Sequence, residues 1–161
     1  MALKENPFAL PEFDLPATNR GSVTREQFKN SFSILYFYPR DDTPGCTREA
    51  QDFRDHYQDF QRLGAQIWGI SRDTLQKHEK FREKYALPFD LISDQEGVLC
   101  EALGVLKEKK LYGKLSIGIE RSTFLVDPQA IVQQSWRRVK VDGHINHLLA
   151  ALSQLQDIIS D

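Results

Sequence analysis

Cysteine is scarce in this sequence: two of its 161 residues are cysteine, Cys46 and Cys100. Two cysteines are too few for the disulfide network that holds small secreted domains together. A chain of this length can bury enough apolar surface to be stable without disulfides. Each cysteine therefore needs its own explanation, and the composition favours a protein of the reducing cytoplasm.

Long apolar runs and an excess of one charge are also missing. The first residues contain no uninterrupted apolar stretch of the length that a secretory signal needs, and no later segment approaches a membrane span. Lys and Arg number 21 against 23 Asp and Glu, so no surplus of positive charge exists to neutralise a nucleic-acid backbone. We therefore expect neither a membrane nor a nucleic acid as a partner.

What remains is the composition of an ordinary globular protein, 40% hydrophobic and 27% charged. The sequence contains no internal repeat, no low-complexity tract and no Gly/Ser linker. We therefore predict a single domain over residues 1–161.

Hydrophobic periodicity predicts the elements of that domain. The apolar run Ser33–Tyr38 stops at Pro39 and is typical of a strand buried on both faces. Apolar residues spaced by three and four then predict an amphipathic helix of about five turns, from Cys46 to Gly64. The lysine-rich stretch 105–120 has poor periodicity, so we expect a loop or an irregular extended segment over the surface there.

Six further elements complete the prediction: a strand over 66–71, a helix over 75–85, a strand over 89–93, a helix over 95–103 capped by Asp94, a hairpin over 122–139 and a final helix over 145–159. Strand, helix and parallel strand make a crossover, and the hairpin and last helix follow it. This order predicts an α/β, thioredoxin-like fold with a central mixed β-sheet flanked by helices. A fold does not define a function, which has to come from the site.

Cys46 lies where the buried strand has ended and the long helix begins. The unsatisfied N–H groups of a first helical turn and the helix dipole favour an anion, and in such settings a cysteine pKa falls from about 8.5 to roughly 3.5–7.5. Gly45 allows the backbone to approach the sulfur closely, and Pro44 stiffens the turn. The hydroxyl of Thr43 can donate to the thiolate or to an oxygen bound beside it. We therefore interpret Cys46 as reactive rather than as a small buried hydrophobic residue.

Several classes of thiol and metal chemistry do not fit this cysteine. A disulfide oxidoreductase would have Cys-x-x-Cys, and a cysteine phosphatase would have arginine where Asp52 stands. No signature singles out one of the four histidines as the base of a papain-like hydrolase. His144 and His147 are three apart on a predicted helix without further ligands, so we interpret them as a solvated face and predict neither metal nor cofactor.

The segment from Pro39 to Cys46 carries the signature Pro-x-x-x-Thr-x-x-Cys and, with its flanks, resembles peroxiredoxins of the bacterioferritin comigratory protein, or PrxQ, subgroup. The resemblance extends from about Phe8 to Leu152. It includes Gly118–Leu125, which is similar to the second active-site segment of that family.

This resemblance implies reduction of a peroxide substrate. It places the guanidinium of Arg121 beside Cys46, where it would stabilise the thiolate and hold the peroxide. Attack of the thiolate on one peroxide oxygen would leave a sulfenic acid, with Thr43 and Arg121 bonding the two oxygens. Glu49 resembles the glutamate that orients the arginine in this family, and a solvent-facing helix acid is the alternative interpretation.

The sequence departs from the two-cysteine pattern of this subgroup. A resolving cysteine would stand five residues after the first or on the following helix, but position 51 is glutamine and residues 75–85 contain no cysteine. Cys100 has apolar neighbours, so we interpret it as a buried structural residue, with an unusual resolving role as the alternative.

We therefore expect a one-cysteine cycle in which an external thiol, such as glutathione, or a glutaredoxin or thioredoxin, reduces the sulfenic acid. The subgroup resemblance favours a monomer. A different class of function stays open: a non-enzymatic redox sensor or chaperone that is switched by oxidation of Cys46.

Overall fold

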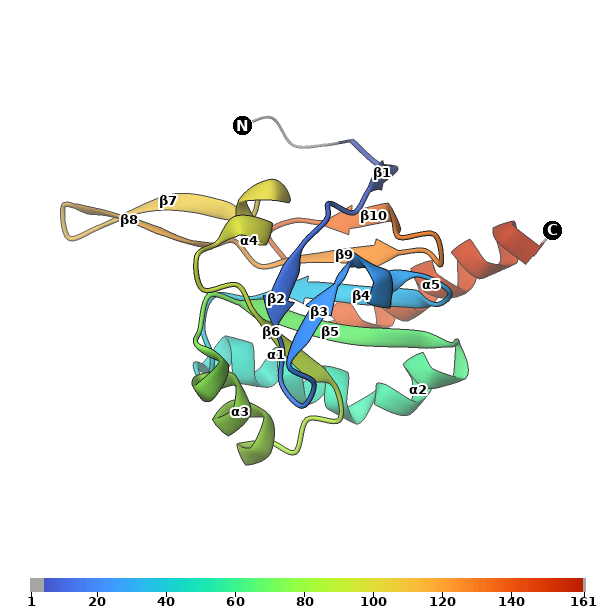
Figure 1. The fold of residues 1–161 in the computed structure, drawn as a ribbon, viewed down its shortest axis with the longest axis horizontal. Helices are drawn as coiled ribbons and strands as arrows, with labels where there is room; N and C mark the ends of the chain where they lie inside the picture. Colours follow the sequence, from blue (N-terminus) through green and yellow to red (C-terminus); the bar gives the residue numbers. More distant parts are fainter. Residues whose placement is uncertain (1–4, 161) are drawn as a thin grey trace.

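The computed structural model describes residues 5–160, which are built around a six-stranded sheet (Figure 1). The strands, in their order across the sheet, are β1 (Phe8–Ala9), β10 (Ile131–Trp136), β9 (Ser122–Val126), β4 (Phe32–Phe37), β5 (Ala65–Ser71) and β6 (Asp90–Ser93). Strands β4, β5 and β6 are parallel, whereas β9, β10 and β1 add antiparallel pairings. The sheet is therefore mixed, as the sequence predicts.

Buried side chains form two clusters, one on each face of this sheet. Successive residues of a strand point to opposite faces, so Leu35 and Phe37 enter one cluster while Ile34 and Tyr36 enter the other. Because both faces are covered, β4 is buried and apolar from Ile34 to Phe37, which confirms the prediction for this strand.

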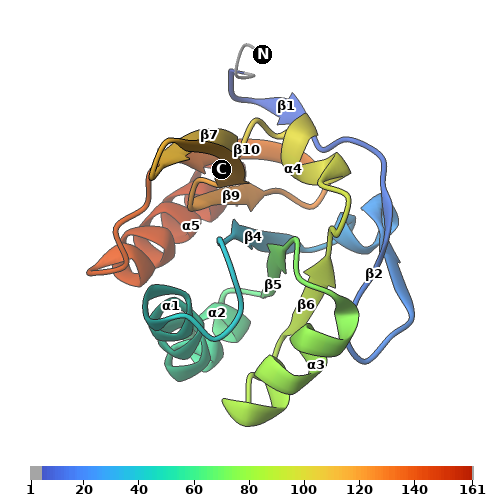
Figure 2. The same ribbon diagram turned by 90° about the vertical axis from the view of Figure 1, so that its left-hand side faces the viewer.

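Helices cover the face that carries Ile34 and Tyr36, and the views in Figures 1 and 2 show α1, α2 and α5 grouped on this side. The other face is covered by α4 and by the N-terminal segment, which contains the two-stranded ribbon of β2 and β3 and the 3-10 turn η1. The bounds are α1 (Pro44–Asp55), α2 (Tyr57–Arg62), α3 (Leu75–Lys84), α4 (Val98–Ala102), α5 (His144–Ser160), β2 (Asp14–Pro16), β3 (Ser22–Thr24) and η1 (Arg25–Phe28). Within residues 5–160, no helix is both long enough and apolar enough to span a membrane.

Two predicted helices have different limits in the structure. The helix predicted from Cys46 to Gly64 is broken at His56, whose ring nitrogen and backbone N–H both contact the carbonyl oxygen of Asp52. The helix predicted over 95–103 is only α4, because Gly97 before it has a left-handed backbone with φ of 76°. The predicted cap, Asp94, still accepts a hydrogen bond from the N–H of Cys100 within α4.

Residues 105–120 are extended, as one of the two predicted alternatives has it, but they are regular rather than irregular. This segment is an antiparallel hairpin of β7 (Leu106–Leu111) and β8 (Lys114–Ile119), which projects from the body of the protein (Figure 1). Tyr112 and Gly113 form its turn, both with positive φ. Most of β8 is exposed, so burial imposes little alternation on its sequence, and the turn is the one local signal of the hairpin.

Gly69 of β5 leaves space for the ring of Tyr36 beneath the helical layer. A Cβ atom at position 69 would lie 2.8 Å from Leu91 Cδ2 and 2.9 Å from the Cζ of Tyr36. Tyr36 cannot retreat easily, because its ring stacks on Phe53 with centroids 4.4 Å apart. We expect Gly69→Ala to destabilise the protein by about 1–3 kcal/mol in urea unfolding. Gly118→Ala, which meets no atom within 4 Å, is the control, and equal midpoints for the two variants would contradict the expectation.

Candidate active site

Cys46 lies in the first turn of α1, which begins at Pro44 directly after the loop that leaves β4. Its exposed fraction is 2%. Thr43 is the N-cap residue, but its side chain makes no capping hydrogen bond; its hydroxyl donates to the carbonyl of Arg40 at 2.9 Å. We expect this hydroxyl to donate to the sulfur or to an oxygen bound beside it; in the structure it donates to the Arg40 carbonyl instead of to the sulfur. The first-turn N–H groups are left without a side-chain acceptor from Thr43, which suits an anion at this end of the helix.

Arg121, directly before β9, brings its guanidinium to the sulfur of Cys46. The Nη2 atom donates to Sγ at 3.4 Å, and Nη1 donates to Oε1 of Glu49 at 2.7 Å. Glu49 is 1% exposed, so it is not the solvent-facing acid of the alternative interpretation. One guanidinium thus spans the two groups from α1, in the fixed fork geometry that arginine provides.

Charges around the sulfur keep Arg121 protonated. Burial alone would lower the pKa of this guanidinium, but the adjacent Glu49 and Cys46 raise its pKa above the ordinary value. Gly45 makes the arrangement possible, since a Cβ atom at this position would lie 3.2 Å from Arg121 Nη2. The glycine that we expect to admit the backbone to the sulfur therefore also leaves room for the guanidinium.

Glu49 and Tyr36 are the other ionisable groups buried beside this contact. The Oε2 atom of Glu49 and the hydroxyl of Tyr36 have no hydrogen-bond partner among the described residues. Burial raises the pKa of Glu49 to about 7, although Arg121 opposes the shift. Burial, followed by the charge of Glu49, also raises the pKa of Tyr36 well above its usual value, so this phenol stays protonated. Nothing in the sequence distinguishes Tyr36 from other core aromatic residues.

The raised pKa of Glu49 predicts a pH-dependent stability. Between the unfolded pKa of 4.5 and the folded pKa of about 7, the folded protein holds a proton that the unfolded chain has lost. The free energy of unfolding therefore decreases as the pH rises through this window. Glu49→Gln keeps an acceptor for Arg121 but cannot titrate. We therefore expect the urea midpoint of the variant to rise relative to that of the wild type as the pH increases from 4.5 to 8. A constant difference between the two midpoints would contradict this assignment.

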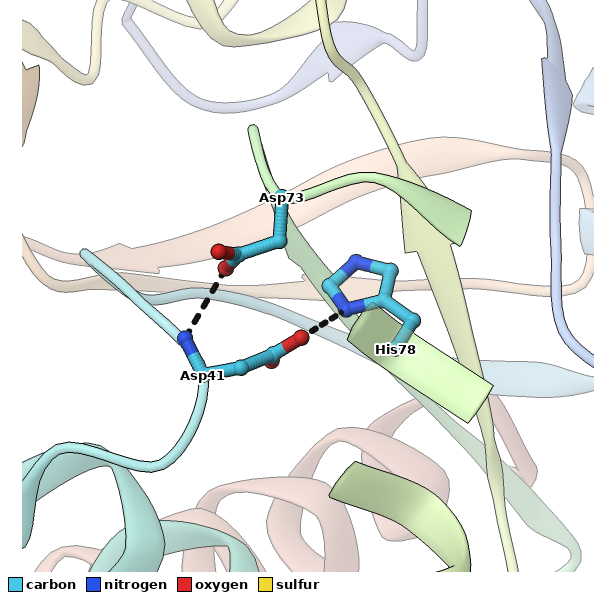
Figure 3. A group of neighbouring side chains, drawn as sticks. All are labelled: Asp41, Asp73 and His78. Carbon is cyan, nitrogen blue, oxygen red and sulfur yellow. Dashed lines mark hydrogen bonds and ion pairs between the residues drawn. The ribbon is translucent and has the colours of Figure 1, made fainter. Parts of the chain in front are cut away.

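The loop before α1 is fastened by a partly buried cluster, in which Asp41 of the loop meets Asp73 of the β5–α3 connection and His78 of α3 (Figure 3). The N–H of Asp41 donates to the carboxylate of Asp73 at 2.8 Å, and Oδ2 of Asp41 lies 2.6 Å from Nδ1 of His78. His78 is fully buried, and its Nε2 faces the carbonyl of Ile92 at 2.9 Å. A carbonyl can only accept, so Nε2 carries a proton, and a second proton has to lie between His78 and Asp41.

Among residues 5–160, these three side chains form a group whose ligand atoms all lie within 4.8 Å of one another. This spacing is close enough to hold a metal ion. The hydrogen bonds already described use the same atoms, and a cation would have to displace the shared proton. Sequence reasoning missed this cluster. Its one signal is that His78 lies on the apolar side of a predicted helix.

Asp42 fastens the same loop from its exposed side. Its carboxylate accepts from Lys84 Nζ at 2.8 Å and from the hydroxyl of Tyr85 at 2.7 Å, and these two hydrogen bonds lower the pKa of Asp42. The residue has a left-handed backbone with φ of 59°, which is unusual outside glycine. Two neighbouring aspartates therefore tie the segment before Cys46 to α3.

His144 departs from its predicted place on a solvated helix face. It is 5% exposed, and its Nε2 lies 2.9 Å from the hydroxyl of Thr123 in β9, while His147 is exposed. Burial, with His147 and Arg121 nearby, lowers the pKa of His144 to about 4. The imidazole is therefore neutral at pH 7 and adds no positive charge near Arg121.

Cys100 belongs to the other side of the molecule. It is buried in the cluster on the opposite face of the sheet from the cluster that contains Cys46. Burial, reinforced by the nearby Asp94, raises the pKa of the Cys100 thiol. The two thiols are free and separated by the sheet.

Comparison with known proteins decides the family. Residues 9–135 match the AhpC/TSA family. Peroxiredoxin Bcp of Xanthomonas campestris is 46% identical over 142 residues, which are 87% of this chain and 89% of that protein. The chain belongs to the peroxiredoxin family. Peroxiredoxin Bcp of Bacillus subtilis is 45% identical to this peroxiredoxin over 147 residues, 91% and 94% of the two chains.

A solved structure supports the same assignment for this peroxiredoxin. The bacterioferritin comigratory protein of Xanthomonas campestris, described in trapped intermediate and ligand complexes that concern its alkyl peroxide reduction, has a TM-score of 0.84 and 43% identity. The match covers 88% of this chain and 90% of that one. The peroxiredoxin is therefore a thioredoxin-fold enzyme of the Bcp/PrxQ group that carries out thiol-dependent peroxide reduction.

Proposed function

We propose that this peroxiredoxin reduces hydrogen peroxide and organic hydroperoxides at Cys46 and regains its thiol from an external reductant. The observation that supports Cys46 is the donation from Arg121 Nη2 to Sγ at 3.4 Å, in a first helical turn. A guanidinium and a helix N-terminus both favour a thiolate, which is the nucleophilic form of cysteine. The alkyl peroxide activity described for the Xanthomonas campestris protein supports organic hydroperoxides as substrates.

The first step exchanges one bond for another at the sulfur. The thiolate of Cys46 attacks one oxygen of ROOH, so that an S–O bond forms and the O–O bond breaks. The electron pair leaves on the other oxygen, which takes a proton and departs as an alcohol or as water. Cys46 is left as a sulfenic acid.

Fixed donors stabilise the charge that moves during this step. Arg121 donates toward the sulfur and the bound oxygens, and Glu49 holds its guanidinium in place. The hydroxyl of Thr43 can join them by turning away from the carbonyl of Arg40. Pro39 and Pro44 frame the loop, and Gly45 leaves the space that the guanidinium occupies.

The second step requires a thiol from outside the chain. Cys100 lies across the sheet from Cys46, is fully buried and has a raised pKa, so it is a poor resolving nucleophile. Glutathione, a glutaredoxin or a thioredoxin would supply the thiol, and we place this cycle in the reducing cytoplasm. We propose a monomer, because the groups around Cys46 that act on the peroxide all belong to one chain.

Intact mass after one equivalent of peroxide tests the cycle. We expect the protein to gain one oxygen atom, localised at Cys46, and to lose it on addition of a thiol. A loss of two hydrogen atoms with a linked Cys46–Cys100 peptide would instead establish an internal disulfide. Turnover separates the enzyme from a redox sensor: many equivalents of peroxide should be consumed in the presence of a thiol, whereas a sensor stops near one.

A further inference from the structure

A cleft of about 710 Å³ opens beside the loop that carries Thr43. Three segments form its walls: the loop before α1 with Pro39, Arg40 and Thr43, the β5–α3 connection from Arg72 to Thr74, and the hairpin residues Ser116–Ile119. Its volume is within the range of small-molecule sites. The cleft reaches Thr43, which caps the helix that carries Cys46, and the hairpin wall leads along the chain to Arg121.

Positive charge is concentrated in this cleft although the whole chain has a formal charge of −2. Arg40, Arg72, Lys77 and Lys109 line it, and within residues 5–160 none of these four side chains forms an ion pair. The one acidic residue of the lining, Asp73, already accepts hydrogen bonds from the N–H of Asp41 and the hydroxyl of Ser71. Unpaired cations in a concave site raise the local concentration of an anionic ligand.

We propose that this cleft binds the reductant, and that the reductant is a small thiol with carboxylate groups, of the glutathione class. The proposal rests on the one-cysteine cycle proposed above. Hydrogen peroxide is small and uncharged, so it would form no ion pairs with the four cations. Cys46 is 2% exposed and does not line the cleft, so its sulfur has to become accessible to any reductant, and the volume of the cleft matches a small peptide thiol rather than a protein. The carboxylates would pair with the lysines and arginines, and the exposed, apolar Ile117 would pack against the peptide.

The bound thiol would react in two balanced steps. Its thiolate attacks Sγ of the Cys46 sulfenic acid; an S–S bond forms, the S–O bond breaks, and the released hydroxide takes a proton to become water. A second thiolate then attacks the glutathione sulfur of the mixed disulfide. This attack releases Cys46 as a thiolate and forms glutathione disulfide, so two thiols supply the two electrons that the peroxide has taken.

Two matched charge reversals test the proposal. Lys109 and its cross-strand neighbour Ser116 line the cleft, while Lys110 points to the other face of the same strand and lies outside it. Lys77 lines the cleft, and Lys80, one turn further along α3, does not. The test pair is therefore Lys77→Glu with Lys109→Glu, and the control pair is Lys80→Glu with Lys110→Glu.

The rate constants to measure are those for reduction of the sulfenic acid form by glutathione and by uncharged dithiothreitol. At low salt we expect the glutathione rate constant to fall about tenfold in the test pair and less than about twofold in the control pair, and the effect to shrink at high salt. The dithiothreitol rate constant and the peroxide rate constant should stay unchanged in both pairs.

Equal glutathione rate constants in the test and control pairs would overturn the cleft assignment. Peroxide turnover with dithiothreitol but none with glutathione would overturn the reductant class and leave the proposed function standing. If the test pair lowers the rate constant for reduction by a glutaredoxin or thioredoxin but not by glutathione, the cleft binds a protein instead. If no thiol supports turnover, the proposed function fails and this inference fails with it.

Discussion

Replacing Cys46 by serine is expected to abolish peroxide consumption. A serine hydroxyl in the first turn of α1 would still face Arg121, but it is a far weaker nucleophile than a thiolate and cannot form a sulfenic acid. We expect the rate to fall to that of peroxide and thiol alone, a loss of at least about 10³-fold. The measurement is steady-state consumption of hydrogen peroxide and of an organic hydroperoxide with dithiothreitol as reductant.

Cys100→Ser is the matched control for this variant. Cys100 is buried on the opposite face of the sheet, and its backbone N–H, which donates to Asp94, is retained in the variant. We expect most of the activity with a small thiol to remain, together with a modest loss of stability. Residual catalysis by Cys46→Ser, or loss of catalysis in folded Cys100→Ser, would show that the wrong sulfur has been assigned.

Arg121→Ala is expected to have the second largest effect. The substitution removes the donor 3.4 Å from the Cys46 sulfur and the cation that would stabilise charge on the peroxide oxygens. Loss of one such preorganised donor costs about 10²–10³-fold in rate, and we expect a fall of that order in kcat/KM for peroxide. Because burial already raises the pKa of Glu49 to about 7, this carboxyl can take up a proton when its partner is removed.

Two further variants make the Arg121 result specific. Arg121→Lys retains the charge but not the planar fork, so it cannot donate in the same geometry to Glu49 and Cys46, and we expect only partial recovery. Arg138→Ala removes an exposed arginine in the same part of the chain and should leave kcat/KM unchanged. Equal peroxide kinetics for Arg121→Ala and Arg138→Ala would refute the proposed role.

Strands β4, β5, β6, β9 and β10, and the start of the helix that carries Cys46, could be predicted because their causes are local. Burial on both faces makes β4 apolar from Ile34 to Phe37, and the strand-to-helix turn alone places Cys46 in a first helical turn. The hairpin of β7 and β8 could not be predicted in this way, since exposed strands carry little hydrophobic alternation.

The parts of the site that depend on distant residues could not be worked out from spacing. Arg121 lies 75 residues from Cys46 along the chain, and only the family resemblance distinguished it from the other arginines. His78 and Asp41 are 37 residues apart, and no local sequence pattern predicts that they share a proton. The sequence pattern indicates a solvated His144, because its contact with Thr123 of β9 depends on a distant part of the chain.

The sheet between the two sulfurs has a kinetic consequence. In the proposed cycle no thiol of the same chain can reduce the Cys46 sulfenic acid. The lifetime of this sulfenic acid therefore varies inversely with the concentration of external thiol. When that supply runs low, a second peroxide molecule competes for the same sulfenic acid and converts it to the irreversible sulfinic form. Peroxide would then inactivate the enzyme irreversibly in cells that have exhausted their thiols.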